Sequence, residues 1–126
     1  MIKPTALLLA YKNCDTCRKA QRWLEEHRVE FTLRPIVEQP PNGAELVRWI
    51  AASGLPIRKW LNVSGQSYRA IGRARVEEAS DAELRAWLAA DGKLVKRPVL
   101  VAEERVVVGF DADAYAELFG TSARSR

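Results

Sequence analysis

The chain has 126 residues, 48% of them apolar and 29% charged, and a formal net charge of +4, which is the composition of one ordinary globular domain. No run approaches the roughly 20 apolar residues of a membrane span, and the first residues lack the pattern of a secretory signal. We therefore expect a cytoplasmic protein without a membrane segment. The mild positive charge fits an anionic substrate, acidic protein partners or incidental attraction to nucleic acid, and it selects none of them. We expect no direct binding to nucleic acid, and the basic residues are spread along the chain. We take residues 1–126 as a single domain with a frayed tail over 121–126.

The first part of the chain predicts a strand, a helix and a second strand. A continuous apolar run over residues 6–11 is typical of a strand buried on both faces. Residues 15–27 carry apolar side chains at helical spacing, and residues 29–33 alternate apolar with polar side chains. The helix is long enough to connect the two strands in parallel.

A helical block is predicted over about residues 42–90. Its signals are a cap at Asn42 for a helix over about residues 43–53, a helical turn at 57–61, a short helix at 68–71, and a capping box at Ser80–Glu83 that starts a helix ending at Asp91. Leu46, Val47 and Ile50 fall on one side of the first of these helices.

The end of the chain predicts a hairpin and a final helix. Residues 99–102 and 105–108 are apolar runs joined by two glutamates, and residues 111–119 have a helical pattern. The predicted order is therefore βα, β, helical block, ββ, α, which is an α/β organisation.

Cys14 and Cys17 are the only cysteines, and they lie at the junction of the first strand and the first helix. A helix N-terminus presents unpaired N–H groups and a partial positive charge, which favour the reactive thiolate over the thiol. A C-x-x-C pair beside a βα pattern is typical of a thioredoxin-like redox motif. Two cysteines and one histidine are too few for a closed zinc site, so we expect no metal. Two inert cysteines remain the alternative.

A second feature is Lys96-Arg97-Pro98, directly before the third strand. Arg97 could present a fixed cation to an anion or to the Cys14 thiolate, and the alternative is a solvated arginine beside a strand-edge proline. Lys12, in the turn before the cysteines, is a further candidate for positive charge at the site. We expect structural roles for the single histidine, His27, and core packing for the four tryptophans, Trp23, Trp49, Trp60 and Trp87.

An ordered set of segments carries a family resemblance. The segments are Tyr11–Ala20, Trp23-Leu24, Gly54–Pro56, Leu61–Gly65, Tyr68-Arg69, Lys96–Leu100 and Val108–Phe110. Together they resemble the ArsC-like family, which includes glutathione- and glutaredoxin-linked arsenate reductases, YffB-type reductase-like proteins and Spx/MgsR redox regulators. The resemblance implies a thioredoxin-like mixed sheet (βαβ…ββα) with an inserted helical block.

The resemblance also implies roles for individual residues. Cys14 matches the nucleophilic cysteine, and Cys17 matches the additional thiol that could resolve an oxidised Cys14. Arg97 matches the arginine that binds oxyanion and stabilises the thiolate, and Pro98 matches the cis-proline of the site.

The chain departs from the arsenate reductases at two positions. Those enzymes resemble one another in two further arginines, and this chain has Asn62 and Phe110 in their places. The sequence around these positions is more similar to the YffB-type and Spx/MgsR branch. The resemblance therefore supports the fold and the reactive cysteine more strongly than it supports arsenate as substrate.

Two functions remain open from the sequence, beside a fold retained without catalytic use. One is a thiol-dependent oxidoreductase without a bound cofactor, for which glutathione is the co-substrate and glutathione, glutaredoxin or thioredoxin is the reductant. The other is a redox-switched transcriptional regulator, similar to Spx and MgsR, that binds the α subunit of RNA polymerase. No feature of the sequence decides between them.

Overall fold

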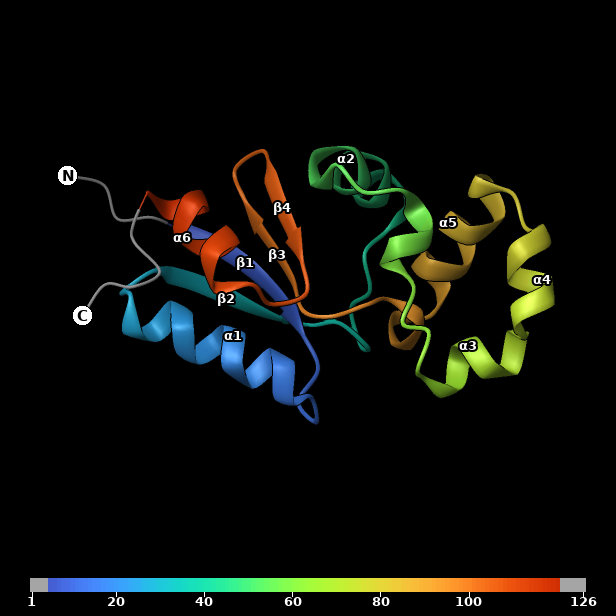
Figure 1. The fold of residues 1–126 in the computed structure, drawn as a ribbon, viewed down its shortest axis with the longest axis horizontal. Helices are drawn as coiled ribbons and strands as arrows, with labels where there is room; N and C mark the ends of the chain where they lie inside the picture. Colours follow the sequence, from blue (N-terminus) through green and yellow to red (C-terminus); the bar gives the residue numbers. More distant parts are fainter. Residues whose placement is uncertain (1–4, 121–126) are drawn as a thin grey trace.

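A computed structural model describes residues 5–120 of the chain, so the tail predicted over 121–126 lies outside the described residues. In chain order the elements are β1 (Thr5–Ala10), α1 (Asp15–Glu26), β2 (Glu30–Pro35), α2 (Gly43–Ser53), the 3-10 helix η1 (Ile57–Trp60), α3 (Gln66–Ile71), α4 (Arg73–Glu78), α5 (Asp81–Ala90), the 3-10 helix η2 (Gly92–Leu94), β3 (Val99–Ala102), β4 (Arg105–Val108) and α6 (Ala112–Phe119). The predicted order of elements is confirmed, with α4 as an addition inside the helical block (Figure 1). None of the helices over residues 5–120 has the length and apolar character needed to cross a membrane.

The strands form one mixed sheet in the order β2-β1-β3-β4. β1 pairs in parallel with β2 and antiparallel with β3, and β3 forms the predicted antiparallel hairpin with β4. Leu8, at the centre of β1, pairs with Leu33 on one side and Leu100 on the other and is fully buried. The continuous apolar run of β1 is thus explained, because this strand lies inside the sheet and is covered on both faces.

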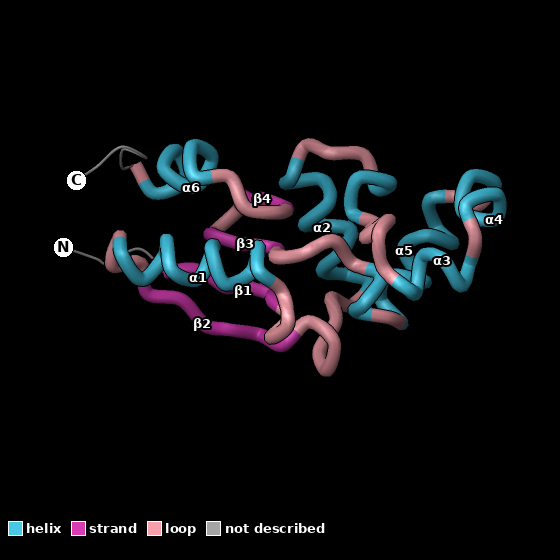
Figure 2. The backbone as a smooth tube through the Cα atoms, turned by 60° about the horizontal axis from the view of Figure 1, so that its bottom comes forward, coloured by secondary structure: helices cyan, strands magenta, loops and turns pink. Residues whose placement is uncertain are grey.

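Alternate side chains of β1 belong to different hydrophobic clusters. Leu8 and Ala10 lie in the cluster that α1 and α6 cover, together with Cys17, Ala20, Trp23, Leu24, Val29, Leu100, Tyr115 and Ala116. We call this the cysteine-face cluster. Figure 2 shows α1 and α6 alongside the strands, with α3, α4 and α5 beyond one end of the sheet.

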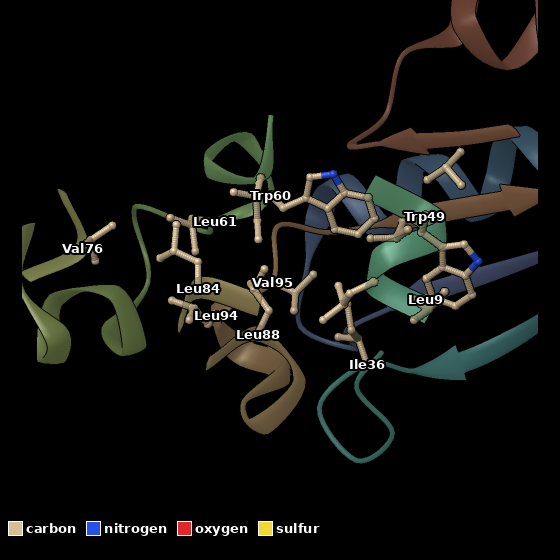
Figure 3. Close-up of a cluster of buried hydrophobic side chains, with 14 of the residues drawn as sticks. Leu9, Ile36, Trp49, Trp60, Leu61, Val76, Leu84, Leu88, Leu94 and Val95 are labelled. Atoms are coloured by element: carbon tan, nitrogen blue, oxygen red, sulfur yellow. The ribbon is translucent and has the colours of Figure 1, made fainter. Parts of the chain in front are cut away.

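The opposite face of the sheet carries a second cluster, which we call the insertion-face cluster. It joins Leu9, Val99 and Val106 of the sheet to buried side chains of the inserted block and of the segments that flank it (Figure 3), namely Ile36, Leu46, Trp49, Ile57, Trp60, Leu61, Val76, Ala79, Leu84, Leu88, Leu94 and Val95. Trp23, Trp49 and Trp60 are buried and Trp87 packs against this cluster, so the expectation of core tryptophans is confirmed.

The caps predicted for two inserted helices are confirmed. Asn42 and Ser80 each form a capping box, with Glu45 and Glu83 respectively, at the start of α2 and α5. Of the three apolar side chains on one side of α2, Leu46 is buried and Ile50 packs against the insertion-face cluster, whereas Val47 is 56% exposed. α2 packs on β4, and Leu46 and Trp49 are its buried residues.

Two further contacts hold the inserted block against the end of β2. Arg34, near the end of β2, forms a bidentate pair with Glu45 of α2 at 2.9 Å for each bond. Gly92 of η2 packs so closely on the backbone after β2 that an added Cβ would stand 1.9 Å from the Ile36 carbonyl oxygen. Both contacts lie where β2 ends, so the block is fixed at the end of the sheet that carries the C-x-x-C loop.

Candidate functional site

Cys14 caps the N-terminus of α1. Its backbone is extended, and its Sγ accepts a hydrogen bond from the Cys17 N–H at 3.1 Å. Side chains that accept from the first-turn amides satisfy donors that have no partner within the helix, and the helix dipole favours negative charge there. The half-buried Cys14 sulfur therefore occupies the position that the sequence analysis expects for a reactive thiolate.

Cys17, one turn further along α1, is in a different setting. It is 2% exposed and belongs to the cysteine-face cluster. Burial raises the pKa of the Cys17 thiol to about 12, and a hydrogen bond to the Cys14 side chain and the charge of Cys14 act in the same direction. The Tyr11 N–H, 3.5 Å from the Cys17 sulfur, and the Arg97 charge lower it in part.

The Arg97–Pro98 segment lies at the same end of the sheet, because the start of β3 pairs with the end of β1. The Arg97–Pro98 peptide bond is cis, as the resemblance implies. The Arg97 guanidinium lies over the Tyr11 ring, with Cζ 4.8 Å from the ring centroid, and its Nη1 donates to the Lys93 carbonyl at 3.4 Å. No hydrogen bond joins Arg97 to either cysteine within residues 5–120, so its effect on Cys17 is through its charge.

Tyr11 is a site residue that sequence reasoning missed. It follows β1 directly, its amide contacts the Cys17 sulfur, and its ring faces Arg97. The signals available were its place three residues before Cys14 and its position at the start of the segment Tyr11–Ala20 that carries the family resemblance. Its partner Arg97 comes from the far half of the chain, and no local pattern reports such a contact.

The other residues considered from the sequence are Lys12 and His27. Lys12 is exposed, and its carbonyl accepts a hydrogen bond from Arg18 at 2.9 Å. His27 stacks on Trp23, with ring centroids 3.8 Å apart, and its Nδ1 is 2.9 Å from the Trp23 carbonyl oxygen. No group of three or more His, Cys, Asp or Glu able to hold a metal ion occurs among the described residues.

Asn62 and Phe110, the two positions at which the family resemblance implies arginines in arsenate reductases, make different contacts. Asn62 donates to the Lys93 carbonyl at 3.4 Å, and this is the oxygen that Arg97 also contacts. Phe110 packs with Cys14 against the cysteine-face cluster and meets Tyr115 edge-on, with ring centroids 5.0 Å apart. A neutral amide and an aromatic ring thus stand where arsenate reductases have cations.

The chain matches the protein-family model described as "ArsC family" over residues 9–118. It is 43% identical to the protein YusI of Bacillus subtilis over 108 residues, which are 85% of this chain and 92% of YusI. It is also 28% identical to the regulatory protein MgsR of the same organism over 81% of this chain and 80% of MgsR.

A solved structure of an ArsC-family-related protein from Bacteroides fragilis is similar in fold and sequence. The TM-score is 0.86 and the identity 42%, over 90% of this chain and 96% of that chain. The thioredoxin-like ArsC-type fold that the sequence predicted is confirmed.

Proposed function

The chain belongs to the ArsC family, and we propose that it is a thiol–disulfide oxidoreductase in which Cys14 is the nucleophile and Cys17 the resolving thiol. The observation that carries this proposal is the unequal setting of the two sulfurs. Cys14 is half-buried and accepts a helix N–H, whereas Cys17 is 2% exposed. The accessible sulfur suits attack on an external disulfide, and the shielded one suits attack on its neighbour.

The proposed reaction has two exchanges. The Cys14 thiolate attacks one sulfur of a disulfide R–S–S–R′, which forms Cys14–S–S–R and releases R′S⁻. Cys17 then loses its proton and attacks the Cys14 sulfur, which forms the Cys14–Cys17 disulfide and releases RS⁻. Two equivalents of a thiol such as glutathione, or one reduced glutaredoxin or thioredoxin, return the pair to the dithiol and are themselves oxidised.

The residues at the three arginine positions favour a disulfide over arsenate as substrate. Three arginines could clamp a tetrahedral oxyanion, but this chain offers Arg97 with Asn62 and Phe110 at the other two positions. One guanidinium can pair with one carboxylate, such as that of glutathione, and the phenyl ring offers apolar contact to the rest of a thiol compound. We therefore propose glutathione as co-substrate in the cytoplasm, with no bound cofactor.

Single-cysteine variants test the proposal. The Cys17→Ser variant, incubated with glutathione disulfide, is expected to accumulate a protein–glutathione mixed disulfide that intact-mass spectrometry detects. The matched Cys14→Ser variant is expected to accumulate none, because the remaining sulfur is buried. Equal accumulation in Cys14→Ser would contradict the assignment of the two roles, and accumulation in neither variant would contradict the proposed exchange.

The similarity to MgsR supports a second candidate, a redox-switched regulator that binds the α subunit of RNA polymerase. The same two sulfurs would then act as a sensor instead of a catalyst. Turnover of a disulfide with glutathione or with NADPH-linked thioredoxin favours the oxidoreductase. Capture of the purified α subunit by only one oxidation state, without turnover, favours the regulator.

A further inference from the structure

Tyr11 connects Arg97 to the thiol pair and has no part in the exchange as described above. Its backbone N–H donates to the Cys17 sulfur at 3.5 Å, and its ring lies 4.8 Å from Cζ of Arg97. The Tyr11 side chain is half-buried and packs against the insertion-face cluster. The ring is thus held by the core on one side and offers a fixed aromatic face to the guanidinium on the other.

We propose, on the basis of the proposed exchange, that Tyr11 is a positioning residue for its second step. The Tyr11 ring holds the Arg97 guanidinium beside the thiol pair, and there the cation promotes attack of the buried Cys17 sulfur on Cys14. The hydrogen bond that the Arg97 side chain donates to the Lys93 carbonyl, at 3.4 Å, is long. The aromatic face is therefore the contact that decides where this charge rests.

The second step needs such help because Cys17 must lose a proton in a dry environment. Burial raises the pKa of Cys17 to about 12, and its hydrogen bond to Cys14 adds to the effect. The two influences that lower the pKa of Cys17 are the Tyr11 amide and the Arg97 charge, and both depend on the placement of Tyr11. Tyr115 of α6 also faces Cys17, and burial raises the pKa of Tyr115, so it stays neutral and adds no charge.

The assisted step needs no further reagent. Cys17 gives its proton to solvent, and its sulfur forms a bond with the Cys14 sulfur. The bond between Cys14 and the substrate sulfur breaks, and that sulfur leaves as a thiolate with the electron pair. Arg97 contributes only positive charge near the developing Cys17 thiolate.

A neutral aromatic disulfide separates the two steps in one experiment. One equivalent of dithiodipyridine releases a first coloured thiopyridone when Cys14 attacks and a second when Cys17 attacks the mixed disulfide. Tyr11→Leu removes the aromatic face and keeps the backbone amide, and Tyr11→Phe is the matched control that keeps the face. We expect Tyr11→Leu to slow the second release about fivefold and leave the first unchanged. Tyr11→Phe is expected to behave as wild type.

Two further readouts separate positioning from a general structural effect. The pH profile of the second release should move to higher pH in Tyr11→Leu but not in Tyr11→Phe. Tyr11→Leu combined with Arg97→Gln should be no slower than Arg97→Gln alone, because Tyr11 acts through Arg97. A wild-type second release in Tyr11→Leu or in Arg97→Gln would overturn the proposal, and so would additive slowing in the double variant.

Failure of this proposal is distinguishable from failure of the exchange itself. A first release that survives Cys14→Ser, or the absence of a second release in the wild type, would contradict the proposed function whatever Tyr11 does. If Tyr11→Leu does not fold, Arg97→Gln removes the same contact from the solvent side. In that case, the proposal requires that the second release of thiopyridone is slower in Arg97→Gln than in wild type.

Discussion

Both faces of the sheet bury apolar side chains, but they differ in what burial does. The cysteine-face cluster contains two groups that can ionise, Cys17 and Tyr115, and burial raises the pKa of both. The insertion-face cluster consists of aliphatic side chains and tryptophans (Figure 3). Desolvation therefore raises the pKa of ionisable groups on the cysteine face, whereas on the insertion face it contributes only to stability.

The comparison predicts that activity and stability can be separated by mutation. The largest expected effect is on activity, from Cys14→Ser on the cysteine face. Loss of the nucleophile should reduce the rate of disulfide exchange about a thousandfold or more. Serine is a favoured helix cap, so the free energy of unfolding should change by no more than about 0.5 kcal/mol. Stopped-flow exchange and urea denaturation measure the two quantities, and a large loss of stability would contradict the separation.

The converse effect is expected from Leu84→Ala on the insertion face. Leu84 is fully buried in α5, and truncation should lower the free energy of unfolding by about 2–5 kcal/mol. The exchange rate of the folded fraction should not change, because no atom of Leu84 belongs to the cysteine-face cluster. A matching truncation on the other face, Leu24→Ala, should cost similar stability and also alter exchange. Equal effects of the two variants on exchange would break the comparison.

A smaller loss of stability is expected where the inserted block meets the sheet. Gly92→Ala would bring a Cβ to 1.9 Å from the Ile36 carbonyl oxygen, so the backbone must move. We expect a loss of about 2 kcal/mol in the free energy of unfolding. Gly43→Ala is the control, because it lies in the first turn of α2 with no atom within 4 Å of the added Cβ. Denaturation curves that rank the two variants in the opposite order would contradict this contact.

The smallest expected effect is the pH dependence of the Arg34–Glu45 pair. The hydrogen bonds from Arg34 lower the pKa of Glu45 below its usual 4.5 in the folded state. The pair therefore contributes stability above the usual pKa, and this contribution is lost as the pH falls through the lower folded value. Glu45→Gln keeps the capping-box pattern and removes the charge, and it should cost about 1 kcal/mol near neutral pH. Unfolding experiments should find no difference from wild type in strong acid, and a constant difference would contradict the ion pair.

Much of this arrangement is visible in the sequence because its signals are local. The cap at Asn42, the cap at Ser80 and the helix that begins after Cys14 each depend on a few neighbouring residues. The two hairpin strands are equally evident from their apolar runs. The family resemblance adds the roles proposed for Arg97 and Pro98.

What the sequence did not reveal depends on contacts between distant segments. The buried side of α2 is set by its packing on β4, which selects Trp49 and leaves Val47 exposed. The contact between Tyr11 and Arg97 forms only because β1 and β3 are neighbours in the sheet. Helical periodicity and spacing carry no information on either choice.

The central claim is that the two sulfurs of one motif differ in accessibility and ionisation. Brief alkylation of the reduced protein with iodoacetamide at neutral pH, followed by peptide mass spectrometry, measures this difference directly. We expect modification of Cys14 and almost none of Cys17, whose pKa is raised to about 12 by burial. Modification of Cys17 at a rate equal to that of Cys14, or before it, would contradict the account.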